Sequence, residues 1–214
     1  MTGNYSRFGV RQRVVSFSTC ALLVALAAAG SALGQQSQDV KPMVNKSPFT
    51  TEQLAVYRAV LTIWSQGEKA AINLSVQTDP VNPSDDSFDK TCLKGLILEK
   101  APVAEVHRFR DEDLAQLGSA KLRLVDPELQ AKEVRENDPG NAIRRGQPVD
   151  DAVNNGFAHG LLTLGEIQFD QSRTHAVVSF GFWCGMLCGN GTTLLMEKRE
   201  GKWIQKKQCG GWMS

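Results

Sequence analysis

Four strand-like runs near the C-terminus decide the fold: Leu161–Phe169 (LLTLGEIQF), Thr174–Trp183 (THAVVSFGFW), Thr192–Arg199 (TTLLMEKR) and Lys202–Cys209 (KWIQKKQC). In the second run every other residue is apolar, which is the pattern of a strand with one buried face. The turns between the runs are too short to hold crossover helices. We therefore expect an antiparallel β-meander of about four strands.

A long amphipathic helix is predicted upstream, over residues 51–65. Thr50 and Gln53 have the spacing of a capping box. Five apolar residues then recur at helical intervals: Leu54, Tyr57, Val60, Leu61 and Trp64. This stripe needs an apolar partner, so we expect the N-terminal amphipathic helix to pack on the C-terminal meander. The predicted fold class is α+β, in a single domain over residues 49–214.

The region between this helix and the meander has weaker patterns. Ala71–Gln77 alternates as a strand does, and Cys92–Leu98 is interpreted as a second short strand. Moderate helical patterns occupy Asp111–Leu117, Pro127–Arg135 and Val149–Asn154. Breaks are predicted at Asp138-Pro139-Gly140 and at Arg144-Arg145-Gly146.

Residues 1–34 have the features of a secretory signal peptide. Three arginines precede an uncharged stretch whose apolar core is Cys20–Ala29 (CALLVALAAA). Ala32 and Gly34 suit the −3 and −1 positions of a cleavage site, which leaves Gln35 as the first mature residue. We therefore expect export to the periplasm or the medium of a bacterial cell, with no stable membrane insertion after cleavage.

Two further inferences concern the N-terminal part of the chain. Residues 35–48 are polar and aperiodic, and are predicted to be a flexible tether. The alternative to cleavage is an uncleaved anchor, because Val14–Leu33 has about the ~20 uncharged residues that span a bilayer.

The overall composition excludes several classes of protein. With 42% hydrophobic and 22% charged residues, the chain is globular rather than disordered. Three of its 24 basic residues and none of its 23 acidic residues lie in the first 34, so the remainder is slightly acidic. A nucleic-acid partner therefore has no electrostatic basis.

Four cysteines remain in the predicted mature chain: Cys92, Cys184, Cys188 and Cys209. An exported protein meets an oxidising environment, so we interpret them as structural disulfide cysteines. Cys184 and Cys188 flank a short glycine-bearing turn, and we favour a bond between them, with the other two paired or free. The rival pairing joins Cys184 or Cys188 to Cys209. A zinc site is less favoured because the C-x₃-C spacing is not repeated.

The last sixty residues also resemble a known group of proteins. The matching segments are Phe182–Gly189 (FWCGMLCG), Gly201-Lys202-Trp203 and Trp212-Met213-Ser214. They resemble a family of uncharacterised exported bacterial single-domain proteins that share a C-G-x-L-C-G turn, a G-x-W strand and a closing W-x-S. The resemblance implies the meander architecture and export, but it implies no chemistry.

Other candidate site residues are sparse. His107, His159 and His175 lack any metal-binding spacing, and no catalytic motif surrounds them. The aspartates of residues 79–89 do not fit a calcium loop. Trp183 lies beside the cysteine turn, on the opposite strand face from Phe182, and is a candidate binding surface. No cofactor is predicted.

Two functional hypotheses remain at this point. The first is a non-catalytic exported domain that binds a protein, an envelope component or a small ligand. The second is a small secreted hydrolase or thiol-active enzyme that uses His175 and a cysteine. We favour the first, because no catalytic constellation is evident.

Overall fold

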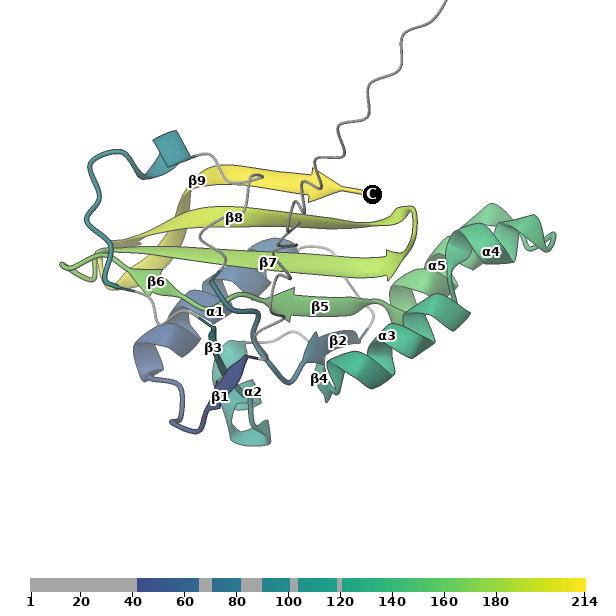
Figure 1. Ribbon diagram of the computed structural model, residues 1–214, viewed down its shortest axis with the longest axis horizontal. Coiled ribbons are helices and arrows are strands. Elements are labelled where there is room, and N and C mark those ends of the chain that lie inside the picture. The colour runs from purple at the N-terminus through teal and green to yellow at the C-terminus, as the bar shows by residue number, and fades with distance from the viewer. Residues whose placement is uncertain (1–41, 66–70, 82–89, 101–103, 119–120) are drawn as a thin grey trace, which may run out of the picture. The chain divides into compact units, whose positions relative to one another are not determined.

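The computed structural model describes residues 42–65, 71–81, 90–100, 104–118 and 121–214, which belong to one compact unit. The predicted signal peptide and the alternative anchor lie outside these residues. The described chain is a mixed α+β structure built on a seven-stranded sheet, with a separate pair of short strands (Figure 1).

The sheet combines parallel and antiparallel strands. Its order is β4 (Leu122–Val125), β2 (Ile72–Ser75), β5 (Leu161–Leu164), β7 (His175–Gly185), β8 (Cys188–Arg199) and β9 (Lys202–Met213), with β6 (Gln168–Phe169) paired to β7. Strands β4, β2 and β5 run parallel. From β5 onward the neighbours are antiparallel, as short connections require. β9 is an edge strand.

The helices begin where the sequence supplies caps. They are α1 (Thr51–Trp64), α2 (Asp111–Leu117), α3 (Pro127–Glu136), α4 (Pro139–Arg144) and α5 (Val149–His159), with a 3₁₀ turn η1 at Lys90–Leu93. Thr50 and Gln53 form a reciprocal capping box at α1. Asp126 and Asp138 cap α3 and α4, each followed by a proline in the first turn, where a missing N–H costs nothing.

The main core lies between α1 and one face of the sheet. Leu54, Val60 and Leu61 of α1 are fully buried, in one cluster with side chains from the sheet that include Leu162, Val178, Met196 and Trp203. On the opposite face a smaller cluster gathers Cys92, Leu195 and Cys209 under η1. The sheet is therefore covered differently on its two faces.

One prediction about local structure is wrong and one is confirmed. Cys92–Leu98 is not a strand: it contains the end of η1 and a turn at Gly95, whose φ of 88° suits glycine. Its cysteine is held by a disulfide rather than by a ladder of hydrogen bonds. The break predicted at Asp138-Pro139-Gly140 is confirmed: α3 ends at Glu136 and α4 begins at Pro139, because Asp138 accepts the Asn141 N–H and Pro139 suits a first helical turn.

The meander prediction also needs extension. The sheet includes β2 and β4, parallel to each other, so it is larger than four strands. Residues 43–45, within the segment predicted as a tether, form β1 (Met43–Asn45), which pairs with β3 (Glu105–His107). The turn between Cys184 and Cys188 is tight, because β7 continues to Gly185 and β8 begins at Cys188, which leaves only Met186-Leu187 between them.

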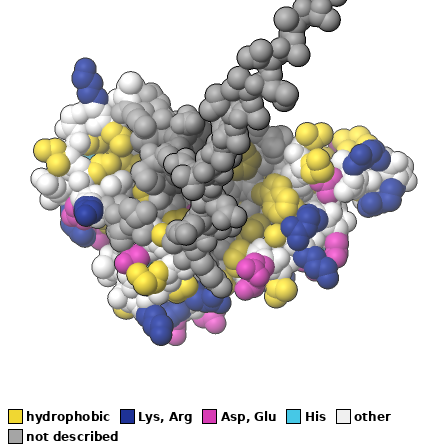
Figure 2. Space-filling view, in the orientation of Figure 1, with side chains coloured by type: hydrophobic (Ala, Val, Ile, Leu, Met, Phe, Trp, Pro, Cys, Tyr) yellow, Lys and Arg dark blue, Asp and Glu magenta, His cyan; other side chains and the backbone are white. Residues whose placement is uncertain are grey.

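Charged side chains of both signs are interspersed over the described surface in Figure 2. The view agrees with the near balance of basic and acidic residues in the sequence.

Candidate functional site

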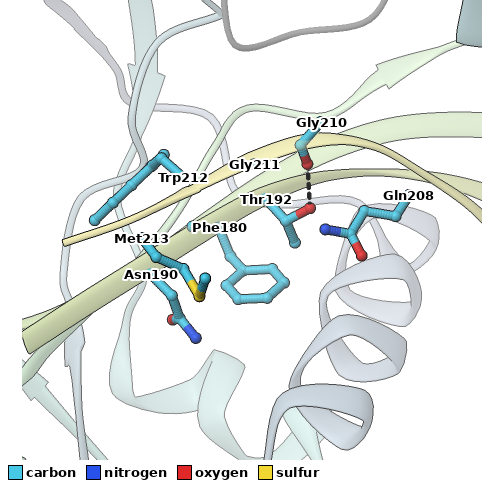
Figure 3. A pocket seen from close by; sticks show the side chains of 9 residues that line it. Phe180, Asn190, Thr192, Gln208, Gly210, Gly211, Trp212 and Met213 are labelled. Carbon is cyan, nitrogen blue, oxygen red and sulfur yellow. Dashed lines mark hydrogen bonds between the residues drawn. The ribbon is translucent and has the colours of Figure 1, made fainter.

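A hollow of about 680 Å³ lies at the C-terminal end of β9, and we call it the β8–β9 hollow. It is lined by Phe180, Asn190, Gly191, Thr192, Gln208, Gly210, Gly211, Trp212 and Met213 (Figure 3). None of these residues is charged. The hollow therefore offers aromatic and thioether surface together with amide and hydroxyl groups, a combination that suits a neutral ligand.

A bulge in β9 shapes this hollow. Thr192 pairs with Gly211, but two positions on Leu194 pairs with Gln208, so β9 carries one extra residue there. Gly210 has a φ of 126°, which favours glycine, and its carbonyl accepts a hydrogen bond from Thr192 Oγ1 (Figure 3). This hydrogen bond stabilises the bulge. It does not involve the side-chain amides of Asn190 and Gln208.

Trp212 rests on a floor made of glycines. A Cβ atom at Gly191 would lie only 2.3 Å from the indole Nε1, and one at Gly189 would lie 3.1 Å from the indole ring. Gly181 forms part of the same floor. The indole is nevertheless 45% exposed. The glycines of β7 and β8 therefore let a tryptophan lie flat against the strands while it stays open to solvent.

Trp183, the candidate binding residue from the sequence, is half-buried. It lies opposite Leu161 on β5 and Gly189 on β8. It does not line the β8–β9 hollow, whereas Trp212 lies at the edge of the hollow, with its side chain on the other face of β9 from Met213 (Figure 3). The signal that sequence reasoning missed is Gly210-Gly211 directly before Trp212, because two glycines in a strand mark a bulge beside an aromatic residue.

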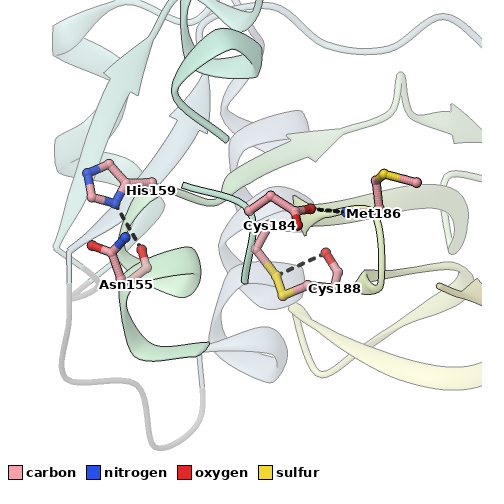
Figure 4. The surroundings of a disulfide bond; sticks show 6 residues. Asn155, His159, Cys184, Met186 and Cys188 are labelled. Atoms are coloured by element: carbon pink, nitrogen blue, oxygen red, sulfur yellow. Dashed lines mark hydrogen bonds between the residues drawn. A yellow bond between two sulfur atoms is a disulfide. The ribbon is translucent and has the colours of Figure 1, made fainter. Parts of the chain in front are cut away.

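The cysteine turn is closed by a bond between Cys184 and Cys188, the pairing that the sequence favoured (Figure 4). Their Cα atoms are 5.0 Å apart. The backbone N–H of Met186 donates to Asp138 Oδ2 at 2.6 Å, which ties the turn to the start of α4. His159 appears in the same view, where it bonds to the Asn155 carbonyl within α5.

The second disulfide joins Cys92 to Cys209 across 117 residues and fastens η1 onto β9. All four cysteines of the described residues are therefore in disulfides. A thiol-active enzyme that uses His175 therefore has no free thiolate among the described residues.

His175 lies at the start of β7 among charged groups. Its Nδ1 is 3.5 Å from Asp170 Oδ2, and its Nε2 is 3.0 Å from Lys206 Nζ and 3.5 Å from Glu197 Oε1. Burial alone would raise the pKa of Asp170, but hydrogen bonds from Ser172, His175 and Thr174 lower that pKa to about 2. Asp170 therefore stays ionised and fixes the turn before β7.

We expect Asp170→Asn to lower the free energy of unfolding by about 1–2 kcal/mol at neutral pH. The folded-state pKa of about 2 lies below the unfolded value of about 3.9. The carboxylate therefore stabilises the fold above about pH 4 and loses this contribution as the pH falls toward 2. In urea unfolding experiments, the difference in free energy of unfolding between variant and wild type should become smaller at low pH. The exposed Glu133→Gln is the control, and equal stability of Asp170→Asn and wild type at pH 7 would contradict the assignment.

A buried polar cluster that the sequence did not reveal joins β3 to the sheet. His107 Nδ1 lies 2.9 Å from Glu166 Oε2, the His107 N–H donates to Oε1 at 2.7 Å, and Thr78 Oγ1 donates to the same oxygen. Tyr57 donates to the Gly165 carbonyl, and burial, with the charge of Glu166, raises the pKa of its hydroxyl. Within the described ranges no nucleophile bonds to His107 Nε2, so we interpret the cluster as a structural tie.

The described residues contain no group of three His, Cys, Asp or Glu side chains that could hold a metal ion. Three of the four aspartates considered for calcium, Asp85, Asp86 and Asp89, lie outside the described residues. In the same part of the chain, no helix has both the length and the apolar content to cross a membrane.

Comparison with known proteins adds no relative: no protein-family model, curated protein or solved structure matches the chain. The candidate site therefore stands on its geometry alone.

Proposed function

We propose that this chain is an exported, non-catalytic binding domain whose β8–β9 hollow holds a neutral, hydroxyl-rich ligand, a glycan segment of the cell envelope. The observation that carries the proposal is the lining of the hollow, which joins Phe180 and Met213 to the side-chain amides of Asn190 and Gln208, with no charged residue among the residues that line it. Its volume falls in the range of about 300–1,000 Å³ typical of ligand pockets.

The chemistry of the lining favours a sugar over a charged or wholly apolar ligand. A saccharide ring has an apolar C–H face that can lie on an aromatic ring, and hydroxyl groups around its rim. The side-chain amides of Asn190 and Gln208 each provide donors and an acceptor for such hydroxyls. A charged ligand would lose its hydration without gaining an ionic partner in the hollow.

Export is part of the same proposal. Two disulfides are compatible with an oxidising compartment, and the resemblance to exported bacterial proteins, with an N-terminal helix packed on a C-terminal meander, agrees with it. We expect the mature protein to begin at Gln35, which N-terminal sequencing of periplasmic or secreted material tests. An intact Met1 in a membrane fraction would favour the anchored alternative.

The binding site itself is tested by calorimetric titration with three tetrasaccharides: N-acetylated chitotetraose, maltotetraose and tetragalacturonate. We expect a neutral tetrasaccharide to bind and the anionic one not to bind at this hollow. Asn190→Ala with Gln208→Ala should weaken binding about tenfold or more, because two hydrogen bonds of about 1 kcal/mol each are lost. Both side chains are exposed, so the fold should persist.

Gln205→Ala supplies the matched control, since this exposed amide lies on the same strand but outside the hollow. Its affinity should equal that of the wild type. Equal weakening by the control and the double variant, or no binding of either neutral tetrasaccharide, would overturn the proposal.

A further inference from the structure

A second hollow, of about 370 Å³, lies on the face of the sheet that η1 covers, and we call it the η1 pocket. Its lining contains Lys94, Lys206, Lys207 and His175, together with apolar surface from Cys92 and Leu195. None of the described residues that line it is a carboxylate. It is thus opposite in chemical character to the β8–β9 hollow, which is uncharged.

Two structural devices bring these basic side chains together. The pairing of β8 with β9 shifts register between Leu195 and Met196, which leaves Lys206 as the extra residue of a bulge. Consecutive strand residues ordinarily point to opposite faces, but a bulge re-aims a side chain. Lys206 and Lys207 can therefore both line the η1 pocket.

Lys94 reaches the same pocket from a distant part of the sequence. The Cys92–Cys209 disulfide fixes η1 against β9, and Lys94 follows two residues after Cys92. The chain then turns at Gly95, which has a positive φ. The Leu96 N–H donates to the Leu93 carbonyl and closes this turn. The disulfide thus keeps Lys94 close to the lysines of β9.

The nearby acids neutralise only part of this charge. Glu197 Oε1 is 3.1 Å from Lys206 Nζ, while Glu197 also pairs with Arg199. Asp170 faces His175. Lys94 and Lys207 have no ion-pair partner among the residues that the structure describes. Among the described residues, the pocket therefore has two ammonium groups without an ion-pair partner that an external anion could pair with.

We propose that the η1 pocket binds a phosphate group carried by a small molecule or by a lipid headgroup. Several ammonium groups around one space suit an oxyanion with more than one charge, which lysine binds as a point charge. The volume leaves room for an organic group beside the phosphate, which Leu195 and the disulfide would contact. This inference is independent of the proposed glycan site.

The test measures binding of inorganic phosphate and of glycerol phosphate to the full mature protein by calorimetry in about 0.15 M salt, where long-range surface attraction is screened. We expect Lys94→Met with Lys207→Met to weaken phosphate binding about tenfold or more. Lys202→Met is the matched control, because this exposed lysine at the start of β9 lies outside the pocket. It should bind phosphate as the wild type does.

Vesicles of phosphatidylcholine, with and without phosphatidic acid, distinguish the two sources of phosphate. Binding to the phosphatidic acid vesicles that free phosphate displaces would identify a lipid headgroup, and binding of glycerol phosphate alone would identify a soluble ester. The absence of phosphate binding would overturn the inference. Equal weakening by Lys202→Met would overturn it as well, because it would indicate general surface charge.

Discussion

Replacing both Cys92 and Cys209 by alanine is expected to destabilise the protein by about 4–5 kcal/mol. The bond closes a loop with a sequence separation of 117, so its removal releases a large amount of chain entropy in the unfolded state. Both cysteines are buried beside Leu195, so the packing under η1 weakens too. Chemical denaturation of the oxidised variant and wild type measures the difference.

The second disulfide provides the matched comparison. Cys184 and Cys188 are only four residues apart, so their replacement by alanine should cost about 2 kcal/mol or less. Both variants remove one disulfide, and only the loop length and site differ. A larger loss for the Cys184 and Cys188 variant would show that the long bond does not restrain the fold as described.

Replacing Leu61 by aspartate should cost several kcal/mol, about 4 or more, and can prevent folding. The side chain is 1% exposed in the core between α1 and the sheet. A carboxylate there loses its hydration without gaining a partner, and the apolar neighbours lose their contacts. Thermal unfolding followed by circular dichroism measures the effect.

Two further variants test the same prediction if Leu61→Asp does not fold. Leu61→Ala should still fold and should lose about 2–5 kcal/mol, because it leaves a cavity. Thr62→Asp, at the exposed next position of α1, should change the stability by less than about 1 kcal/mol. An unchanged melting temperature for Leu61→Ala would mean that this face of α1 is not the core face.

Much of the fold can be predicted from the sequence, because the strongest hydrophobic patterns are local. The stripe from Leu54 to Trp64 and the alternation in β7 each recur over ten or more residues, so tertiary context has little power to override them. Strand β4 is different: it has only four residues, none of them fully buried and one of them, Arg123, exposed, so it is too short for a periodic pattern to stand out. Its pairing with β2 depends on a distant partner that no local pattern encodes.

The candidate site was less predictable, because it depends on register. The bond between Cys184 and Cys188 can be predicted from their short spacing. The partner of Cys92 cannot, because it depends on where η1 lies against β9. Trp183 is a candidate in the sequence because it lies beside this turn, but it does not line the hollow. The residues of the hollow come together only because β9 bulges at Gly210, and such a bulge is set by strand pairing.

The central claim, that the β8–β9 hollow binds a neutral glycan, is tested most directly by NMR of methionine methyl groups during titration with N-acetylated chitotetraose and maltotetraose. Met213 lines the hollow, whereas Met196 is buried in the core and Met186 lies at the cysteine turn. We predict that a neutral tetrasaccharide shifts the Met213 signal while the Met196 and Met186 signals stay in place. A Met213 signal that does not move with either sugar, or a shift confined to Met186, would contradict the account.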